Sequence, residues 1–341
     1  MEMQQVEGEV RMEQQKRIGI IGGGLAGVFA ARQLMTEGYA VEIIEKSQSV
    51  GGRMATRRID EGTADHGAVF FTVRTDELAQ EVDEWLEQGL IRKWFGDDFP
   101  RYVAVNGMNQ LVQSIACGIP VHLNEQVERI LAEGPALQTT AAAETRTYDA
   151  ILLTAPVPQA YDLLSASPLM LVDSDHARLG KVTFEPTFVG LFELEKSPDL
   201  GEVGLLDEDL PSGILKIVNN AQKEVSATPL LSVYMTGDWS EVWYDKGEDA
   251  TLAEIERLLQ EQLGPVKVVS KQLKRWRYAQ ARDVFRTPYL KLEQHPLWLA
   301  GDAFLDPQDT SGRTRVESAV ISGLRVASAM DAHFKAVLTE Q

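Results

Sequence analysis

The stretch RIGIIGGGLAGVFAARQLMTEGYAVEIIEKSQSVGGRMATRR, residues 17–58, decides the fold. Its apolar run at residues 18–21 is typical of a buried parallel strand. The run leads into three glycines at G-x-G-x-x-G spacing, Gly22, Gly24 and Gly27. Glycines at this spacing permit a tight turn, a close approach of the backbone to a pyrophosphate, and packing of a helix on the strand. The pattern therefore predicts a nucleotide-binding unit.

The residues after the glycines complete this βαβ unit. Residues 25–37 are expected to form a helix whose first N–H groups face the phosphates, and Gly38 ends it. A second strand is expected over residues 39–44 and ends on Glu45. Glu45 follows Gly27 at about the spacing expected of a carboxylate that binds ribose.

A second group of residues indicates which nucleotide binds. The segment SVGGRMAT, residues 49–56, places two glycines beside Arg53. Glycine lets the backbone approach a phosphate, and a guanidinium neutralises it. A simple nicotinamide-dependent dehydrogenase has no need of this additional phosphate-binding segment, so the segment favours a flavin.

The chain resembles the flavoprotein superfamily that contains amine oxidases, phytoene desaturases and renalases. The R-x-G-G-R-x-x-[ST] extension of that superfamily is matched from Gly51 to Thr56, with Ser49 in place of the first arginine. Further segments resemble bacterial renalase-like proteins in order and spacing: ADHGAVFFT at 64–72, RYV at 101–103 with NGM at 106–108, RWRYA at 275–279, and LAGD at 299–302 leading to RVE at 315–317.

The resemblance implies an α/β fold with two interleaved domains. The first is a Rossmann-like FAD-binding domain of the GR2, or amine-oxidase, type, expected over residues 17–72, 101–158 and 295–335. The second is a substrate or cap domain on a mainly antiparallel sheet, expected over residues 73–100 and 159–294. Within it, residues 251–254 match a capping box that would open a helix. Residues 1–16 are interpreted as a disordered leader.

The implied cofactor is noncovalent FAD. A strand that ends in Asp302 can place a carboxylate on the ribityl hydroxyls, and a helix that opens near Val316 can aim N–H groups at the pyrimidine edge of the flavin. The full set of cofactor-binding candidates is Gly22, Gly24, Leu25, Ala26, Gly27, Glu45, Lys46, Gly52, Arg53, Gly67, Ala68, Val127, Asp302 and Val316.

The expected substrate pocket combines Val69 and aromatic residues with the segment NGM at 106–108 and one arginine. Its members are Val69, Phe70, Phe71, Asn106, Gly107, Met108, Trp276, Tyr278 and Arg315. Arg313 is a rival for the role of Arg315, because the loop 305–314 looks longer than that of the family. The family commonly has glutamine where Val69 stands. His66 is either a residue that touches flavin or substrate, or a structural histidine.

Composition narrows the classes of function. The formal net charge of −18 over 341 residues argues against nucleic acid as a partner. No apolar run reaches the roughly 20 residues of a membrane helix, so the predicted location is the cytoplasm. The single cysteine, Cys117, excludes an internal disulfide and is interpreted as an inert residue inside a helix. None of the five histidines forms a metal-binding pair, so no metal is expected.

Three functional hypotheses follow. The first is a renalase-like oxidase that converts dihydronicotinamide isomers of NAD(P)H to NAD(P)⁺ and reduces dioxygen to hydrogen peroxide. The second is a flavin amine oxidase or desaturase that acts on another small donor, although the lysine near flavin N5 in amine oxidases has no clear counterpart. The third is a non-catalytic flavin-binding protein. No catalytic acid or base is predicted, because flavin N5 accepts the hydride.

Overall fold

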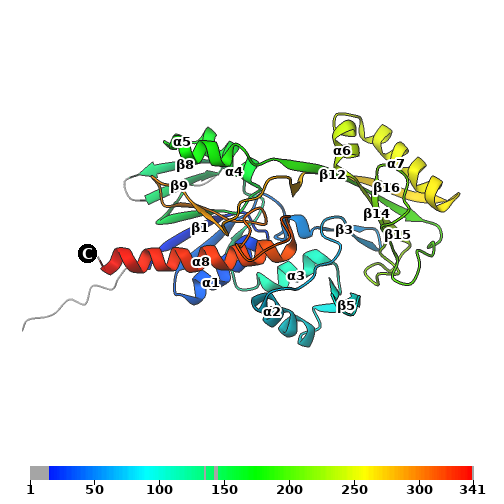
Figure 1. Ribbon diagram of the computed structural model, residues 1–341, viewed down its shortest axis with the longest axis horizontal. Coiled ribbons are helices and arrows are strands. Elements are labelled where there is room, and N and C mark those ends of the chain that lie inside the picture. Colours follow the sequence, from blue (N-terminus) through cyan, green and yellow to red (C-terminus); the bar gives the residue numbers. More distant parts are fainter. Residues whose placement is uncertain (1–14, 134–135, 142–144, 340–341) are drawn as a thin grey trace, which may run out of the picture.

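The computed structural model describes residues 15–133, 136–141 and 145–339, so nearly all of the predicted leader lies outside the described residues. A six-stranded sheet forms the centre of one half of the molecule (Figure 1). All its neighbouring strands are parallel except the first two. The order across the sheet is β17 (Leu290–Lys291), β18 (Leu297–Leu299), β11 (Ala150–Leu153), β1 (Arg17–Ile21), β2 (Ala40–Ile44) and β7 (Val121–His122).

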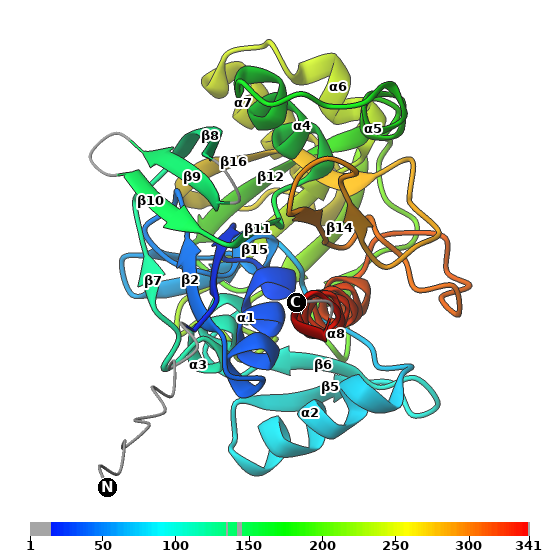
Figure 2. The ribbon, with the colours of Figure 1, turned by 90° about the vertical axis from the view of Figure 1, so that its left-hand side faces the viewer.

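The two faces of this sheet are covered differently because side chains alternate along each strand. Ile18 and Ile20 of β1 share a core with helices, whereas Ile21 belongs to a second core. The helices on the first face are α1 (Leu25–Thr36), α3 (Met108–Ile115) and α8 (Val316–Thr339). Figure 2 shows α1 and α8 side by side. The second core includes residues of β8 (Val127–Glu133), β10 (Thr145–Tyr148), α4 (Val157–Ala166) and α5 (Asp173–Leu179), and β9 (Ala136–Ala141) lies between β8 and β10.

The other half of the molecule is built on a five-stranded antiparallel sheet. Its order is β13 (Leu205–Leu206), β14 (Ile214–Asn219), β15 (Leu230–Met235), β12 (Phe184–Leu194) and β16 (Val268–Ala281). One face packs against α6 (Gly237–Trp243) and α7 (Glu248–Leu263), which Figure 1 shows at the far end from α8. The other face packs against Ile59, Ala64 and Val69.

Several smaller elements pack around the two sheets. The hairpin of β3 (Thr56–Ile59) and β4 (Gly62–Asp65) contacts β15, and the short 3₁₀ helix η1 (Gly52–Met54) precedes it. Residues 73–100, predicted in the substrate domain, include α2 (Asp76–Glu87) and β5 (Ile91–Phe95), which pairs with β6 (Arg101–Ala104). Trp85 of α2 packs edge-on against Phe29 of α1, so this segment shares a core with the nucleotide-binding sheet.

The predicted fold class is confirmed: a Rossmann-like parallel sheet is combined with a mainly antiparallel one. Two local predictions are wrong. Thr251 does not cap a helix, because α7 already begins at Glu248 and the Thr251 hydroxyl donates to the Gly247 carbonyl at 2.9 Å. Acidic residues suit the first turn, and two occupy it here. Cys117 is exposed and follows the C-cap residue of α3, so it is not inside a helix. No helix within the described ranges is both long and apolar enough to span a membrane.

Candidate functional site

A cavity of about 250 Å³ lies where the antiparallel sheet meets the nucleotide-binding half. Its walls come from segments far apart in the sequence, and it includes predicted cofactor residues from both ends of the chain. Its lining includes Leu25, Arg53, His66, Gly67, Ala68, Thr187, Lys216, Tyr234, Trp276, Asp302, Arg315 and Val316.

The glycine loop leaves the start of α1 open. Gly24 is the N-cap residue, makes no side-chain cap, and has no atom within 4 Å of the position that a Cβ would occupy. By contrast, a Cβ on Gly27 would lie 2.2 Å from the Gly22 carbonyl oxygen, so only glycine fits there. The first N–H groups of a helix have no partner within the helix. Those of Leu25, Ala26 and Gly27 are therefore free to bind an anion.

Glu45 holds the glycine loop from the end of β2. One carboxylate oxygen accepts a hydrogen bond from the Gly23 N–H at 2.7 Å, and the other accepts one from the Ser47 N–H at 2.8 Å. A carboxylate has about four acceptor positions, so capacity for ribose hydroxyls remains. Glu45 itself does not line the cavity, and neither does the exposed Lys46 or Val127, which is buried at the start of β8.

The glycine pair at 51–52 positions η1 against the glycine loop at 22–24. Gly51 and Gly52 have φ angles of +124° and +51°, which L side chains rarely adopt. The Gly51 N–H donates to the Gly23 carbonyl at 2.7 Å. A Cβ on Gly52 would approach the Cα of Gly24 to 3.5 Å. This packing directs Arg53, the next residue, into the cavity.

Arg53 and Asp302 form an ion pair on the cavity wall. One Nη of Arg53 donates to the Asp302 carboxylate at 2.7 Å, and the other donates to its second oxygen. Arg53 also donates to the Ala279 carbonyl of β16 at 3.2 Å. Asp302 follows β18, and Val316 at the start of α8 lines the same cavity. The predicted cofactor-binding residues Arg53, Asp302 and Val316 thus lie together in the lining of one cavity.

These residues fit a flavin dinucleotide. The space at Gly24 and the uncapped start of α1 suit a diphosphate, because phosphates bind at free helix N-termini. Arg53 adds a cation, and Asp302 adds acceptors for hydroxyl groups. Within the part of the chain that the structure describes, no cluster of His, Cys, Asp or Glu is arranged to hold a metal.

His66 and Trp276 form an aromatic wall of the cavity. Their ring centroids are 5.4 Å apart with an interplanar angle of 24°, and Trp276 Nε1 donates to the His66 carbonyl at 2.6 Å. Burial, with a smaller contribution from the charge of Lys274, lowers the pKa of His66 to about 4. The ring is therefore neutral at pH 7. Its buried Nδ1 atom has no hydrogen-bond partner among the described residues.

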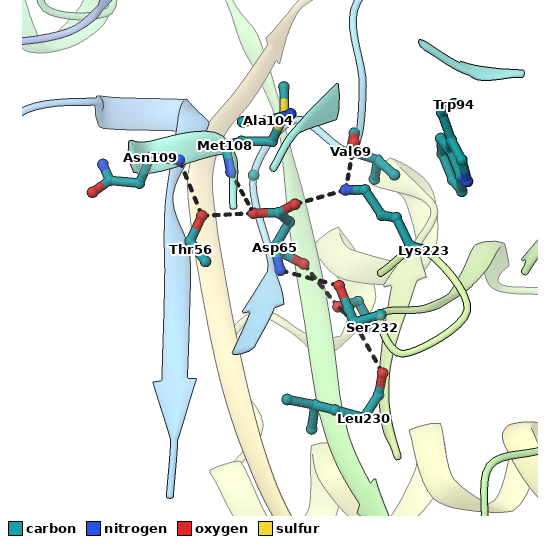
Figure 3. Close-up of polar contacts among 12 residues, drawn as sticks. Thr56, Asp65, Val69, Trp94, Ala104, Met108, Asn109, Lys223, Leu230 and Ser232 are labelled. Atoms are coloured by element: carbon teal, nitrogen blue, oxygen red, sulfur yellow. Dashed lines mark hydrogen bonds and ion pairs between the residues drawn. The ribbon is translucent and has the colours of Figure 1, made fainter. Parts of the chain in front are cut away.

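A buried ion pair holds the segment that carries His66 (Figure 3). The side chains of Asp65 and Lys223 are 1% and 0% exposed, and Lys223 Nζ lies 2.6 Å from both the Asp65 carboxylate and the Val69 carbonyl. The other Asp65 oxygen accepts hydrogen bonds from the Thr56 hydroxyl at 2.6 Å and the Met108 N–H at 2.9 Å. Burial lowers the pKa of Lys223, and the Asp65 charge opposes this shift.

Several predicted pocket residues lie elsewhere. Val69 is buried against the antiparallel sheet, Phe70 packs on Trp94 and Phe71 packs on Trp85, so none of the three predicted residues lines the cavity. The cavity lining also does not include Asn106, Gly107, Met108 or Tyr278. Their predicted contacts with substrate stay predictions. Val69, Phe71 and Met108 lie in protein cores and Phe70 packs against one of them, whereas the Asn106 side chain is exposed.

Arg315 lines the cavity, but its charge is engaged. Its guanidinium lies 2.9 Å from the Asp309 carboxylate and 3.0 Å from the Glu317 carboxylate. Both partners line a second, polar cavity of about 210 Å³ at the starts of α2 and α8, which Arg315 also lines. Arg313, the rival candidate, is exposed and lines neither cavity.

Sequence reasoning missed several residues that the antiparallel sheet contributes to the cavity: Thr187 on β12, Leu215 and Lys216 on β14, Tyr234 on β15 and Gln280 on β16. Lys216 carried a signal, because it is a lone charged residue within the apolar stretch ILKIV at 214–218. The Tyr234 hydroxyl lies within hydrogen-bond distance of the Asp65 and Gly67 carbonyls, 3.0 and 3.1 Å away, and burial raises its pKa well above the ordinary value. No local pattern indicated that contact.

Comparison with known proteins agrees with this geometry. The profile of the family described as "Flavin containing amine oxidoreductase" matches residues 87–331, more than half of the chain. The profile of the NAD(P)-binding Rossmann-like domain matches residues 20–85. A 4-hydroxybenzoate brominase (decarboxylating) from Marinomonas mediterranea is 37% identical over 79 residues, which are 23% of this chain and only 15% of that protein.

Two solved structures share the fold over 94% of the chain. Cyclohexylamine oxidase from Brevibacterium oxydans superposes with a TM-score of 0.67 at 14% identity, covering 94% of this chain and 100% of its own. Putrescine oxidase with bound putrescine superposes with a TM-score of 0.66 at 16% identity, covering 94% and 99%. At such low identities the likeness concerns the fold alone.

Proposed function

The chain belongs to the flavin containing amine oxidoreductase family, and we propose that it is a renalase-like oxidase with noncovalent FAD as its cofactor. Its substrates are dihydronicotinamide isomers of NAD(P)H. The balanced reaction converts the dihydronicotinamide, one proton and dioxygen into NAD(P)⁺ and hydrogen peroxide. When bound, FAD supplies the hydride acceptor at N5 of its ring and passes the electrons to dioxygen.

One observation carries this proposal: a single cavity brings the Arg53–Asp302 pair together with the stacked rings of His66 and Trp276. The first group suits a dinucleotide cofactor, and the second offers a face against which a planar ring can stack. Hydride transfer from such a ring needs orientation and exclusion of water rather than an acid or a base. The neutral His66 ring is compatible with that requirement.

The chain's own residues divide this work. The N–H groups at the start of α1 and the Arg53 guanidinium would bind the diphosphate of the cofactor. Asp302 would accept hydrogen bonds from its hydroxyl groups, and the N–H groups at the start of α8 would stabilise negative charge on the flavin ring. Trp276 and His66 orient the donor, while the antiparallel sheet covers it.

The test is to purify the protein, record its visible spectrum and mix it anaerobically with candidate donors. We expect the 2- and 6-dihydro isomers of NAD(P)H to bleach the flavin much faster than ordinary NADPH or simple amines. Rapid bleaching by amines alone would instead establish the alternative, an amine oxidase, which is the activity named for the two solved structures. No bleaching by any donor would favour a non-catalytic flavin-binding protein.

A further inference from the structure

Among the cations that line the cavity, Lys216 differs from the others in having no anionic partner. Arg53 is paired with Asp302, and Arg315 is paired with Asp309 and Glu317. Over the described residues, no carboxylate lies within ion-pair distance of the Lys216 ammonium, and its Nζ makes no hydrogen bond. Lys216 is therefore the cation of the cavity lining that makes no ion pair among the residues that the structure describes.

The surroundings of Lys216 make this charge unfavourable in the ligand-free protein. Lys216 is partly buried on β14, opposite Tyr234 of β15, and its Nζ lies 5.3 Å from the centre of the Tyr234 ring. This cation–π contact compensates only part of the lost hydration. Burial and the charge of Lys223 lower the pKa of Lys216, while the exposed Asp207 raises it without forming an ion pair. An unpaired cation in such a place is typical of a ligand-binding group.

We propose that Lys216 binds an anionic group of the substrate, a phosphate or a carboxylate. This inference rests on the proposed function and deepens it, because it assigns anion recognition to Lys216 rather than to Arg315. It also restricts the substrate class. A donor whose only charge is an ammonium group would meet a like charge in the cavity, and such juxtapositions discriminate against the wrong ligand.

The position of Lys216 favours a phosphate set apart from the reacting ring. The sheet order places β15 and β12 between β14, which carries Lys216, and β16, which carries Trp276. Three strand spacings amount to roughly 14 Å between the two backbones. A donor stacked near Trp276 therefore reaches Lys216 best when its anionic group is several bonds away from its ring, as in a nicotinamide mononucleotide.

The experiment measures binding of two matched ligand pairs to the FAD-loaded enzyme by titration calorimetry. Nicotinamide mononucleotide and nicotinamide riboside differ by one phosphate, and benzoate and benzamide differ by one negative charge. A charge-assisted hydrogen bond corresponds to about a tenfold or greater preference for the anionic member. We expect this preference in the wild type, its loss in Lys216→Met, and its retention in Lys216→Arg.

Lys267→Met is the matched control, because it removes the charge of a lysine whose side chain is 74% exposed and paired with Glu195 outside the cavity. This variant should keep the wild-type preference. A preference in the mononucleotide pair alone identifies a phosphate ligand, and one in the benzoate pair alone identifies a carboxylate. The proposal is overturned if neither pair shows a preference in the wild type, or if the preference persists in Lys216→Met.

The outcome is independent of the proposed reaction, because no ligand in either pair is oxidised. If the dihydronicotinamide isomers fail to bleach the flavin but the anion preference depends on Lys216, the proposed reaction is wrong and the anion site stands. If bleaching occurs without any anion preference, the reaction stands and the anion site is wrong. Thermal unfolding and flavin content are measured for each variant to check that Lys216→Met and Lys216→Arg are folded and contain FAD.

Discussion

Arg53 and Asp302 are 249 positions apart in the chain, yet they meet on one cavity wall. Arg53 follows two glycines with positive φ angles, which L side chains rarely adopt, and Asp302 follows a strand of the parallel sheet. Each side chain partly neutralises the other in the ligand-free protein. A cofactor phosphate would add a second anion beside the same guanidinium, which has five N–H donors and can bind both.

At this scale we predict that Arg53→Ala weakens FAD binding at least about tenfold, because a charge-assisted contact is lost and Asp302 is left unpaired near the phosphates. The measurement is the dissociation constant of FAD for the apoprotein, followed by flavin fluorescence. Arg58→Ala is the control, since Arg58 is an exposed arginine of the same segment and does not line the cavity. Equal FAD affinity in wild type and Arg53→Ala would contradict the assigned role.

Among the elements, the contact between α1 and α8 sets the geometry of the cofactor half. Both helices begin at the cavity, at Leu25 and Val316, so their packing determines how their N-termini converge. They approach closely at Gly323, where a Cβ would lie 2.4 Å from the Ala26 carbonyl oxygen. That carbonyl belongs to the backbone and cannot move aside as a flexible side chain would.

Gly323→Val is therefore expected to destabilise the protein by about 1–3 kcal/mol, the usual effect of overpacking, by forcing α8 away from α1. The free energy of unfolding in urea measures this effect. Ala332→Val places the same side chain at an exposed position of α8 and should change stability by only about 0.5 kcal/mol. If Gly323→Val loses no more stability than Ala332→Val, the close contact with Ala26 does not constrain the two helices.

Over the whole molecule, the Asp65–Lys223 pair connects elements of two cores, since β4, β14 and β15 share one core and α3 belongs to another. Asp65 ends β4, Lys223 lies between β14 and β15, and the Met108 N–H that also binds Asp65 begins α3 (Figure 3). The pair thereby fastens the antiparallel sheet to the segment 66–68 at the cavity. Because the pair is buried, removing one partner leaves the other charge without a counter-ion and without hydration.

We expect Lys223→Met to destabilise the protein by about 3–5 kcal/mol, because it leaves the Asp65 carboxylate buried without its partner. The double variant Lys223→Met with Asp65→Asn removes both charges and should recover part of that loss. Lys267→Met, which breaks an exposed pair, should cost no more than about 1 kcal/mol. Urea unfolding of the four proteins tests this, and a double variant less stable than Lys223→Met would argue against a coupled pair.

The sequence by itself determined the βαβ unit, its glycine loop, the additional phosphate-binding segment at Arg53 and the return of the chain at Asp302. These features depend on local spacing, since a glycine turn or a strand end is set by a few neighbouring residues. The tertiary structure alone decided that Val69, Phe70 and Phe71 fill cores, that Arg315 is engaged by Asp309 and Glu317, and that Lys216 faces the cavity without an anion. The tertiary structure alone also decided the contact between Asp65 and Lys223, which are 158 positions apart. Which long-range side chains meet depends on how the two sheets pack, and periodicity along the chain carries no information about that packing.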